Sequence, residues 1–148
     1  MTEIVYNNNN ILLKKYNNYN ASNSMIMYHI TTKKNAQSII KNGFDISLSK
    51  HGAFGLGINL TTDINHLKIY YEMNKQNNYI ITCTVKFNKK QRNISGKLIT
   101  DEHGNMYTKP KHLTPSKGFD ILYNKENEIY VVPSSNQVYP LFIYEINF

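Results

Sequence analysis

Met25-Ile26-Met27-Tyr28-His29-Ile30-Thr31-Thr32 is the stretch where a polar N-terminal region gives way to a core-forming sequence. The run from Met25 to Ile30 is short and apolar and is bounded by two threonines, which is typical of a buried strand. Thr32 is suited to cap a helix over residues 35–42, where apolar side chains recur at helical spacing. Gly43 follows directly and favours the left-handed conformation that ends a helix. The stretch therefore predicts a strand followed by a short helix.

The rest of the chain predicts more strands than helices. After a short strand at residues 58–60, Asp63 can cap a second helix from residue 64 to about 75. Residues 79–87 are rich in β-forming residues, and three further strands are expected at 119–123, 128–132 and 137–146. Helices come early and strands late, without a regular β-α alternation. This order indicates an α+β fold with a mostly antiparallel or mixed sheet and a few short helices.

Polar segments suggest how the chain is divided. Residues 7–24 are dominated by Asn, Ser, Tyr and Lys, so we expect residues 1–24 to be a loosely ordered, Asn-rich N-terminal arm. Residues 25–148 would form a single domain, since 148 residues suffice for one hydrophobic core. Residues 47–57 are expected to be a loop, and residues 92–117 an insertion or a long functional loop.

The composition favours acidic ligands without specifying one. Lys and Arg total 17 against 10 Asp and Glu, and the formal net charge of +7 suits nucleotides, nucleic acid or phosphorylated protein. An AT-rich genome would equally over-use Lys, Asn, Ile and Tyr, and all four are frequent here. The basic residues form no stripe interleaved with aromatic residues along the sequence. No RNA-binding module is therefore predicted.

The single cysteine and the N-terminal residues bear on the compartment. Because Cys83 is the only cysteine in the sequence, no intrachain disulfide can form. It lies in an apolar run, as a small core residue would. The N-terminal residues lack the basic and apolar regions of a signal peptide, and no apolar stretch approaches a membrane span. We expect an intracellular protein, cytoplasmic or nuclear, that is monomeric and does not engage a membrane. The five histidines lack ligand spacing, so no metal site is expected.

Three places carry residues suited to chemistry. His29 ends the first buried strand, where an imidazole is held rigidly and titrates near neutral pH, although a histidine satisfied at the core edge fits equally. Gly55 and Gly57 precede the strand at 58–60 and would let the backbone approach a ligand, or would form an ordinary turn. Glu128 starts an apolar strand, where it could orient a substrate hydroxyl or lie in a solvated acidic turn.

Taken in order, these pieces resemble the poly-ADP-ribose-polymerase branch of the ADP-ribosyltransferase superfamily. The resemblance covers residues 25–146. The matching elements are Tyr28-His29, the helix ending at Gly43-Phe44, Phe54-Gly55-Leu56-Gly57-Ile58, Tyr70, Phe119-Asp120-Ile121, Asn127–Val132 and Gln137-Val138-Tyr139-Pro140.

The resemblance implies an ADP-ribosyltransferase fold with a split sheet that binds NAD as a substrate. His29 would bond the nicotinamide ribose, the backbone of Ile30 would hold the nicotinamide carboxamide, and Tyr70 would stack on the nicotinamide ring. Thr31, Gly57 and Asn59 would complete the NAD site. Glu128 would hold the ribose 2′-hydroxyl and stabilise the positive charge that develops as nicotinamide departs.

The chain departs from the family pattern at several positions. Ile30 stands where the family has Gly, Asn59 replaces one of two stacking tyrosines, and Leu67 stands where a Ser is usual. Glu128 takes the catalytic place if the loop before Gln137 is one residue longer than usual, whereas counting without a gap places Ile129 there. Because a carboxylate is costly to bury, we expect Glu128, Tyr130 and Val132 to face the cleft, with Ile129 and Val131 behind the sheet.

The resemblance thus predicts transfer of single ADP-ribose units from NAD to a protein or nucleic-acid acceptor, with release of nicotinamide. The altered pocket at Asn59 and Leu67 favours single units over polymers. Two alternatives stay open: a catalytically inactive relative that binds NAD, ADP-ribose or a macromolecular partner, and an RNA 2′-phosphotransferase. The RNA 2′-phosphotransferase branch uses a second His and Arg pattern that this sequence lacks.

Overall fold

Two four-stranded sheets organise the chain in a computed structural model that describes residues 2–48, 55–92, 98–100, 106–108 and 114–146. The first sheet is antiparallel, with the order β1 (Thr2–Tyr6), β10 (Val138–Glu145), β4 (Tyr79–Phe87) and β2 (Asn23–Thr31). The second has the order β3 (Ile58–Leu60), β9 (Ile129–Val132), β8 (Ile121–Asn124) and β5 (Lys90–Arg92). It is mixed, because β5 runs parallel to β8. The predicted α+β class is confirmed.

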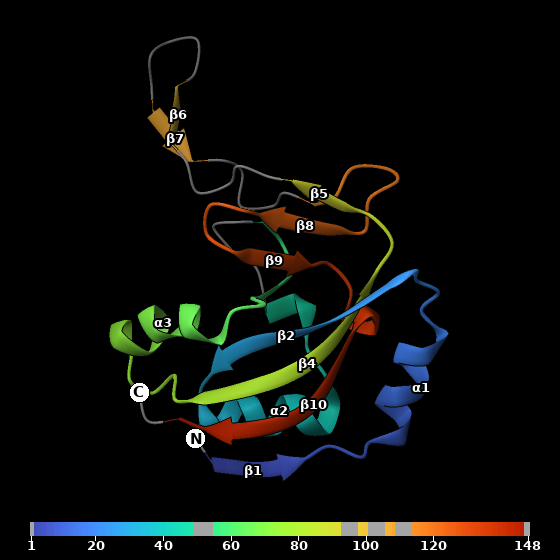
Figure 1. Ribbon diagram of the computed structural model, residues 1–148, viewed down its shortest axis with the longest axis vertical. Coiled ribbons are helices and arrows are strands. Elements are labelled where there is room, and N and C mark those ends of the chain that lie inside the picture. Colours follow the sequence, from blue (N-terminus) through green and yellow to red (C-terminus); the bar gives the residue numbers. More distant parts are fainter. Residues whose placement is uncertain (1, 49–54, 93–97, 101–105, 109–113, 147–148) are drawn as a thin grey trace.

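A separate two-stranded hairpin lies beyond the second sheet. Strands β6 (Leu98–Thr100) and β7 (Met106–Thr108) pair antiparallel with each other and project away from both sheets (Figure 1). Much of the polar segment predicted at residues 92–117 lies outside the described residues, as do residues 49–54 of the predicted loop at 47–57.

The predicted helices form where their caps are. Helix α2 (Lys33–Asn42) begins after Thr32, whose side chain accepts a hydrogen bond from the backbone N–H of Asn35, and it ends at Gly43 with φ +82°. The predicted second helix starts as the 3-10 turn η2 (Ile64–Leu67), capped by Asp63, and continues as α3 (Lys68–Met73). Two further 3-10 turns, η1 (Ile46–Leu48) and η3 (Ser135–Gln137), lie in connections. No helix in the described ranges is long and apolar enough to cross a membrane.

The N-terminal region differs from the loosely ordered arm expected for residues 1–24. Strand β1 pairs with β10 as an edge strand, and helix α1 (Asn10–Asn18) follows it. The asparagines have structural roles: Asn9 caps α1 by accepting from two backbone N–H groups, and Asn7 donates to the carbonyl of Pro140 at 2.7 Å. Tyr16 is buried, with its hydroxyl 2.8 Å from that of Thr84. Asn-rich composition thus supplied caps and turns here rather than disorder.

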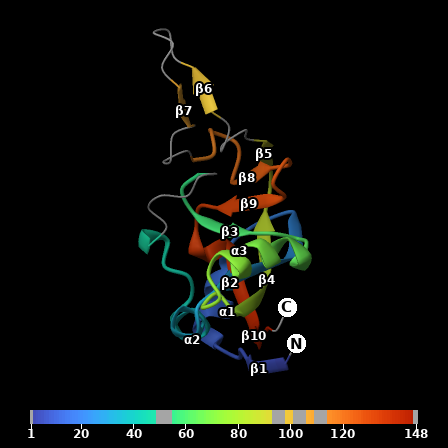
Figure 2. The ribbon, with the colours of Figure 1, turned by 90° about the vertical axis from the view of Figure 1, so that its left-hand side faces the viewer.

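The main core lies between the two sheets and fixes how they stack. Its members include Met27 and Ile81 from the first sheet, Tyr130 and Val132 from the second, and Ala36 from α2. Where the sheets meet, Tyr28 on β2 exchanges two backbone hydrogen bonds with Thr61, at 2.7 and 3.0 Å. This bridge ties the free edge of β2 to the end of β3. Figure 2 shows β2 and β3 close together in the middle of the molecule, with α2 below and β5 above.

Candidate functional site

His29 lies at the junction of the two sheets and lines two cavities. Its Nδ1 is 2.7 Å from the carbonyl oxygen of Asn59 on β3. Since a carbonyl can only accept, Nδ1 carries the proton in this contact, and Nε2 of the neutral ring remains an acceptor. Burial lowers the pKa of His29 from its ordinary value of 6.5, and it outweighs the opposing effect of the hydrogen bond to Asn59. The ring is therefore neutral at pH 7 and offers one fixed acceptor.

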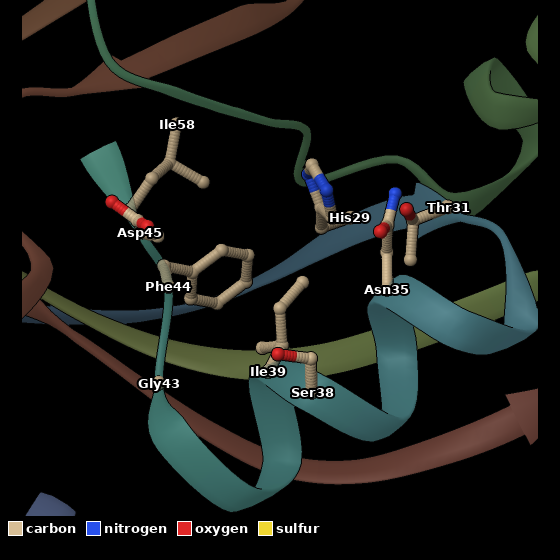
Figure 3. A pocket seen from close by; sticks show the side chains of 9 residues that line it. All are labelled: His29, Thr31, Asn35, Ser38, Ile39, Gly43, Phe44, Asp45 and Ile58. Carbon is tan, nitrogen blue, oxygen red and sulfur yellow. The ribbon is translucent and has the colours of Figure 1, made fainter. Parts of the chain in front are cut away.

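The first cavity, of about 140 Å³, lies between β2, helix α2 and the segment that follows it. Figure 3 shows the imidazole of His29 beside the ring of Phe44, and the two rings meet edge-on with centroids 5.2 Å apart. Asn35 and Ser38 project from one face of α2 toward this space, and Asp45 lies across from them. The lining therefore combines an apolar floor with several groups that can hydrogen-bond to hydroxyls.

The second cavity, of about 90 Å³, lies on the other side of His29. Its walls are mostly apolar and come from β3, η2, α3 and β9, and its lining residues besides His29 are Ile30, Asn59, Leu60, Leu67, Tyr70 and Ile129. The Tyr70 side chain is half-buried and packs against the apolar residues of both β9 and η2. A cavity with this mostly apolar lining suits a ring with few polar atoms.

The backbone N–H and C=O of Ile30 point toward the free edge of β2. In an antiparallel ladder, alternate residues direct both their N–H and C=O to the same side of the strand. Tyr28 uses both groups on the Thr61 side, away from β4, so Ile30, two residues later, directs its own groups to the same edge. This edge borders the second cavity, which Ile30 lines.

Asn59 adds a further acceptor that no described group satisfies. Its Oδ1 is buried and has no hydrogen-bond partner among the described residues. Leaving a buried amide oxygen unpaired costs free energy. Asn59 and Ile30, which both carry hydrogen-bonding groups, thus belong to the lining of a mostly apolar cavity.

Most of the sequence-predicted site residues come together. His29, Ile30, Asn59 and Tyr70 line the second cavity, while Thr31 lines the first. Gly57 lines neither cavity. It packs against β9 so closely that an added Cβ would lie 2.4 Å from the carbonyl oxygen of Val132, so its contribution is to seat β3 beside β9.

The expected orientation of Glu128 is wrong. Strand β9 begins one residue later, and Ile129 rather than Glu128 lines the second cavity. Ile129 and Val131 share the face that packs on Tyr70, whereas Tyr130 and Val132 lie in the main core. Both faces of this strand are covered, so burial cost keeps the carboxylate out of either one.

Glu128 instead occupies a turn at the start of β9. It has a left-handed backbone, with φ +53°, and its side chain is half-exposed. One carboxylate oxygen lies 3.7 Å from Nδ1 of His66, the residue before Leu67. The carboxylate therefore stands next to residues that line the cavity without lining it itself.

Several residues of the first cavity were not foreseen. Asn35, Ser38 and Asp45 carry no motif, and only the three-residue spacing of Asn35 and Ser38 on a helix could have hinted that they share a face. The one cysteine, Cys83, is fully buried in the core, and burial raises its thiol pKa far above the ordinary range, so it is no nucleophile.

Within the ranges that the structure describes, no three His, Cys, Asp or Glu side chains gather as a metal site would require, and His51, His103 and His112 lie outside those ranges. A scan against models of known protein families finds no match for this chain, and neither does a comparison with curated proteins.

Proposed function

We propose that this chain has an ADP-ribosyltransferase-type fold that binds NAD across the two cavities and transfers single ADP-ribose units to a macromolecular acceptor. The observation that carries the proposal is that one half-buried, neutral histidine lines both cavities. NAD has two nucleoside halves of different chemistry, and a bipartite site with a shared hinge residue suits such a ligand.

The hydrogen-bonding groups and apolar walls of the second cavity match those of nicotinamide. A primary carboxamide needs one acceptor for its N–H and one donor for its carbonyl, and the free edge of Ile30 provides both. The orphan Oδ1 of Asn59 could take the second amide proton. Tyr70, Leu60 and Ile129 would enclose the apolar ring. The Ile30 side chain does not interfere with this recognition, because the groups involved belong to the main chain.

The first cavity suits the adenosine half. Asn35, Ser38 and Asp45 can bond ribose hydroxyls or ring nitrogens, and Phe44 offers an apolar surface. The Nε2 atom of His29 would accept a hydrogen bond from a ribose hydroxyl, because the contact with Asn59 fixes the tautomer. These contacts would hold the dinucleotide so that the bond to nicotinamide lies beside the second cavity.

Transfer would break the bond between C1′ of the ribose and the nicotinamide nitrogen. The electron pair leaves with nicotinamide, and a nucleophile of the acceptor forms the new bond to C1′. Ile129 stands in the cavity where a carboxylate would otherwise hold a ribose hydroxyl, and members of the resembled family with an apolar residue at this place make single transfers or none. Single-unit transfer is therefore the activity that fits this cavity.

The second candidate function is binding of NAD or ADP-ribose without turnover. The observation that favours it is the same apolar residue: Ile129 lines the cavity, whereas the carboxylate of Glu128 lies beside His66 and does not line it. Such a protein would bind the dinucleotide with the same contacts but leave the bond to nicotinamide intact.

Titration calorimetry with NAD, ADP-ribose and nicotinamide tests the binding, and labelled NAD tests the transfer. We expect His29→Ala to weaken NAD binding by about five-fold to a hundred-fold, the range for losing one buried hydrogen bond. Glu128→Gln serves as the matched control and should bind like the parent protein. Label on an acceptor supports transfer, and binding without label supports the second candidate. Equal affinity of His29→Ala and the parent, with both folded, would rule out the proposed site.

A further inference from the structure

The positive charge of this chain is concentrated in one segment. Residues 86–125 make up little more than a quarter of the 148 residues but contain nine of the 17 Lys and Arg and only three of the ten Asp and Glu. Their surplus of six positive charges accounts for nearly all of the net +7. Compositional drift would spread Lys along the whole chain, so drift does not explain this segregation.

The described part of this segment places its cations at one edge of the second sheet. Lys89, Lys90 and Arg92 belong to or flank β5, the edge strand, and all three are exposed. Lys117 is also exposed and precedes β8, the strand that pairs with β5. In Figure 1 this edge lies in the upper part of the molecule, below strands β6 and β7 and far from α2 and β1.

The nearby carboxylates neutralise only part of this charge. Glu126 forms an ion pair with Arg92 at 2.6 Å, so this carboxylate offsets the charge of Arg92 rather than that of the lysines. Asp120 is occupied with the backbone: it accepts from the N–H groups of Asn88 and Lys89 and from the hydroxyl of Tyr19. These bonds hold the start of β5 in place beside β8.

Aromatic rings lie directly beside these lysines. The Nζ of Lys89 is 4.9 Å from the ring centre of Phe119, and the Nζ of Lys90 is 4.7 Å from that of Tyr123. Both rings are half-buried, and Tyr123 is also backed by Tyr130, whose ring centre is 4.6 Å away. The lysines and rings are about 30 residues apart in sequence, and the pairing of β5 with β8 brings each lysine beside its ring at the same edge of the sheet.

We propose that this surface, formed by Lys89, Lys90, Lys117, Phe119 and Tyr123, binds single-stranded nucleic acid. Lysines would contact the phosphates, and a base would stack on Phe119, as on the aromatic platforms of single-strand-binding proteins. An exposed cation–π contact is weaker than base stacking, so Lys89 can leave the ring for a phosphate when a base arrives. A duplex would hide its base faces from these rings, and an acidic polypeptide or a lipid headgroup would not use them. The site lies outside both cavities and does not depend on NAD binding.

Fluorescence anisotropy with a labelled 20-nucleotide single strand over a range of salt concentrations tests the proposal. The slope of log K against log salt is negative, and each lost phosphate contact reduces its magnitude by about 0.7 for a single strand, so Lys89→Ala/Lys90→Ala should reduce the magnitude by about 1.4. Lys33→Ala/Lys34→Ala, at the opposite end of the molecule, removes the same charge and should leave the slope unchanged. Phe119→Leu keeps an apolar side chain but removes the ring, and it should weaken binding about five-fold or more.

Three results would overturn the proposal. The first is equal affinity of the parent and Lys89→Ala/Lys90→Ala, which changes only exposed residues and should stay folded. The second is an equal loss in the Lys33→Ala/Lys34→Ala control, which would indicate a non-specific charge effect. The third is equal or tighter binding of a DNA duplex or of polyglutamate, which would show that the rings play no part. Circular dichroism of Phe119→Leu separates lost stacking from lost folding.

Discussion

Replacing Gly57 by alanine tests whether close contact between β3 and β9 builds the site. Gly57 has φ +148°, a conformation that side chains rarely adopt, and an added Cβ would lie 2.4 Å from the carbonyl oxygen and 2.9 Å from the carbonyl carbon of Val132. Both atoms belong to the backbone of a buried strand, so neither can move aside as a flexible side chain would. Gly118 provides a matched control, since it has φ +92° and no atom within 4 Å of an added Cβ.

The comparison separates backbone strain from overlap. Gly118→Ala meets strain alone, and we expect it to lower the free energy of unfolding by about 1–2 kcal/mol. Gly57→Ala adds a steric overlap, which typically costs about 1–3 kcal/mol in a packed interior, so the total should be roughly 2–5 kcal/mol. Urea titration followed by far-UV circular dichroism measures both variants against the parent.

The two variants should unfold at different urea concentrations, while the slope of the unfolding free energy against urea concentration should be the same in both. If Gly57→Ala is no less stable than Gly118→Ala, the tight seat of β3 on β9 is wrong. The placement of Asn59 beside His29, which depends on that seat, would then need to be revised.

Four other substitutions or treatments test separate features of the site and core. Burial lowers the pKa of His29, so below about pH 6.5 the unfolded chain binds a proton that the folded chain does not. The free energy of unfolding should therefore decrease as the pH is lowered below about 6.5, and it should decrease less steeply in His29→Gln. Ile129→Ala should cost about 2–5 kcal/mol of stability in urea, whereas Glu128→Gln should cost under about 1 kcal/mol because its side chain and its contact with His66 are half-exposed; equal costs would contradict the observed strand register. Tyr70→Leu should weaken nicotinamide binding by roughly two- to ten-fold in calorimetry, the range for one aromatic contact, and unchanged affinity would remove Tyr70 from the site. Cys83 is buried with a raised thiol pKa, so a disulfide reagent should label it only at the rate of unfolding, and rapid labelling of the native protein would contradict its placement.

Local signals in the sequence were sufficient for the elements that depend on neighbouring residues. Thr32 and Gly43 bound helix α2 as predicted, because a cap and a left-handed stop act within one turn of the helix. The apolar run at residues 79–87 forms β4 over the same range. The order of helices and strands also sufficed for the α+β class.

Composition was a poor guide to the N-terminal region. An asparagine-rich segment is expected to be disordered only when the rest of the chain offers no hydrogen-bond partners for its polar groups. Here β10 offers an edge to β1, and Pro140 offers a carbonyl to Asn7. Those groups come from the far end of the chain, more than 130 residues away, and no local pattern announces them.

The site shows the same division. The sequence by itself indicated that His29 lies near the end of a strand, that Ile30 follows it, and that a carboxylate and an isoleucine are neighbours at residues 128 and 129. The prediction that this strand is buried is wrong, because β2 is an edge strand in which only Met27 and Thr31 are buried. Only the tertiary structure decided which of those two lines the cavity, because the choice depends on covering both faces of β9. It also decided the tautomer of His29, through the carbonyl of Asn59, and brought Lys89 and Lys90 onto rings 30 residues away. Each of these outcomes is a contact between strands, and a strand's partner is chosen by the whole fold rather than by its own residues.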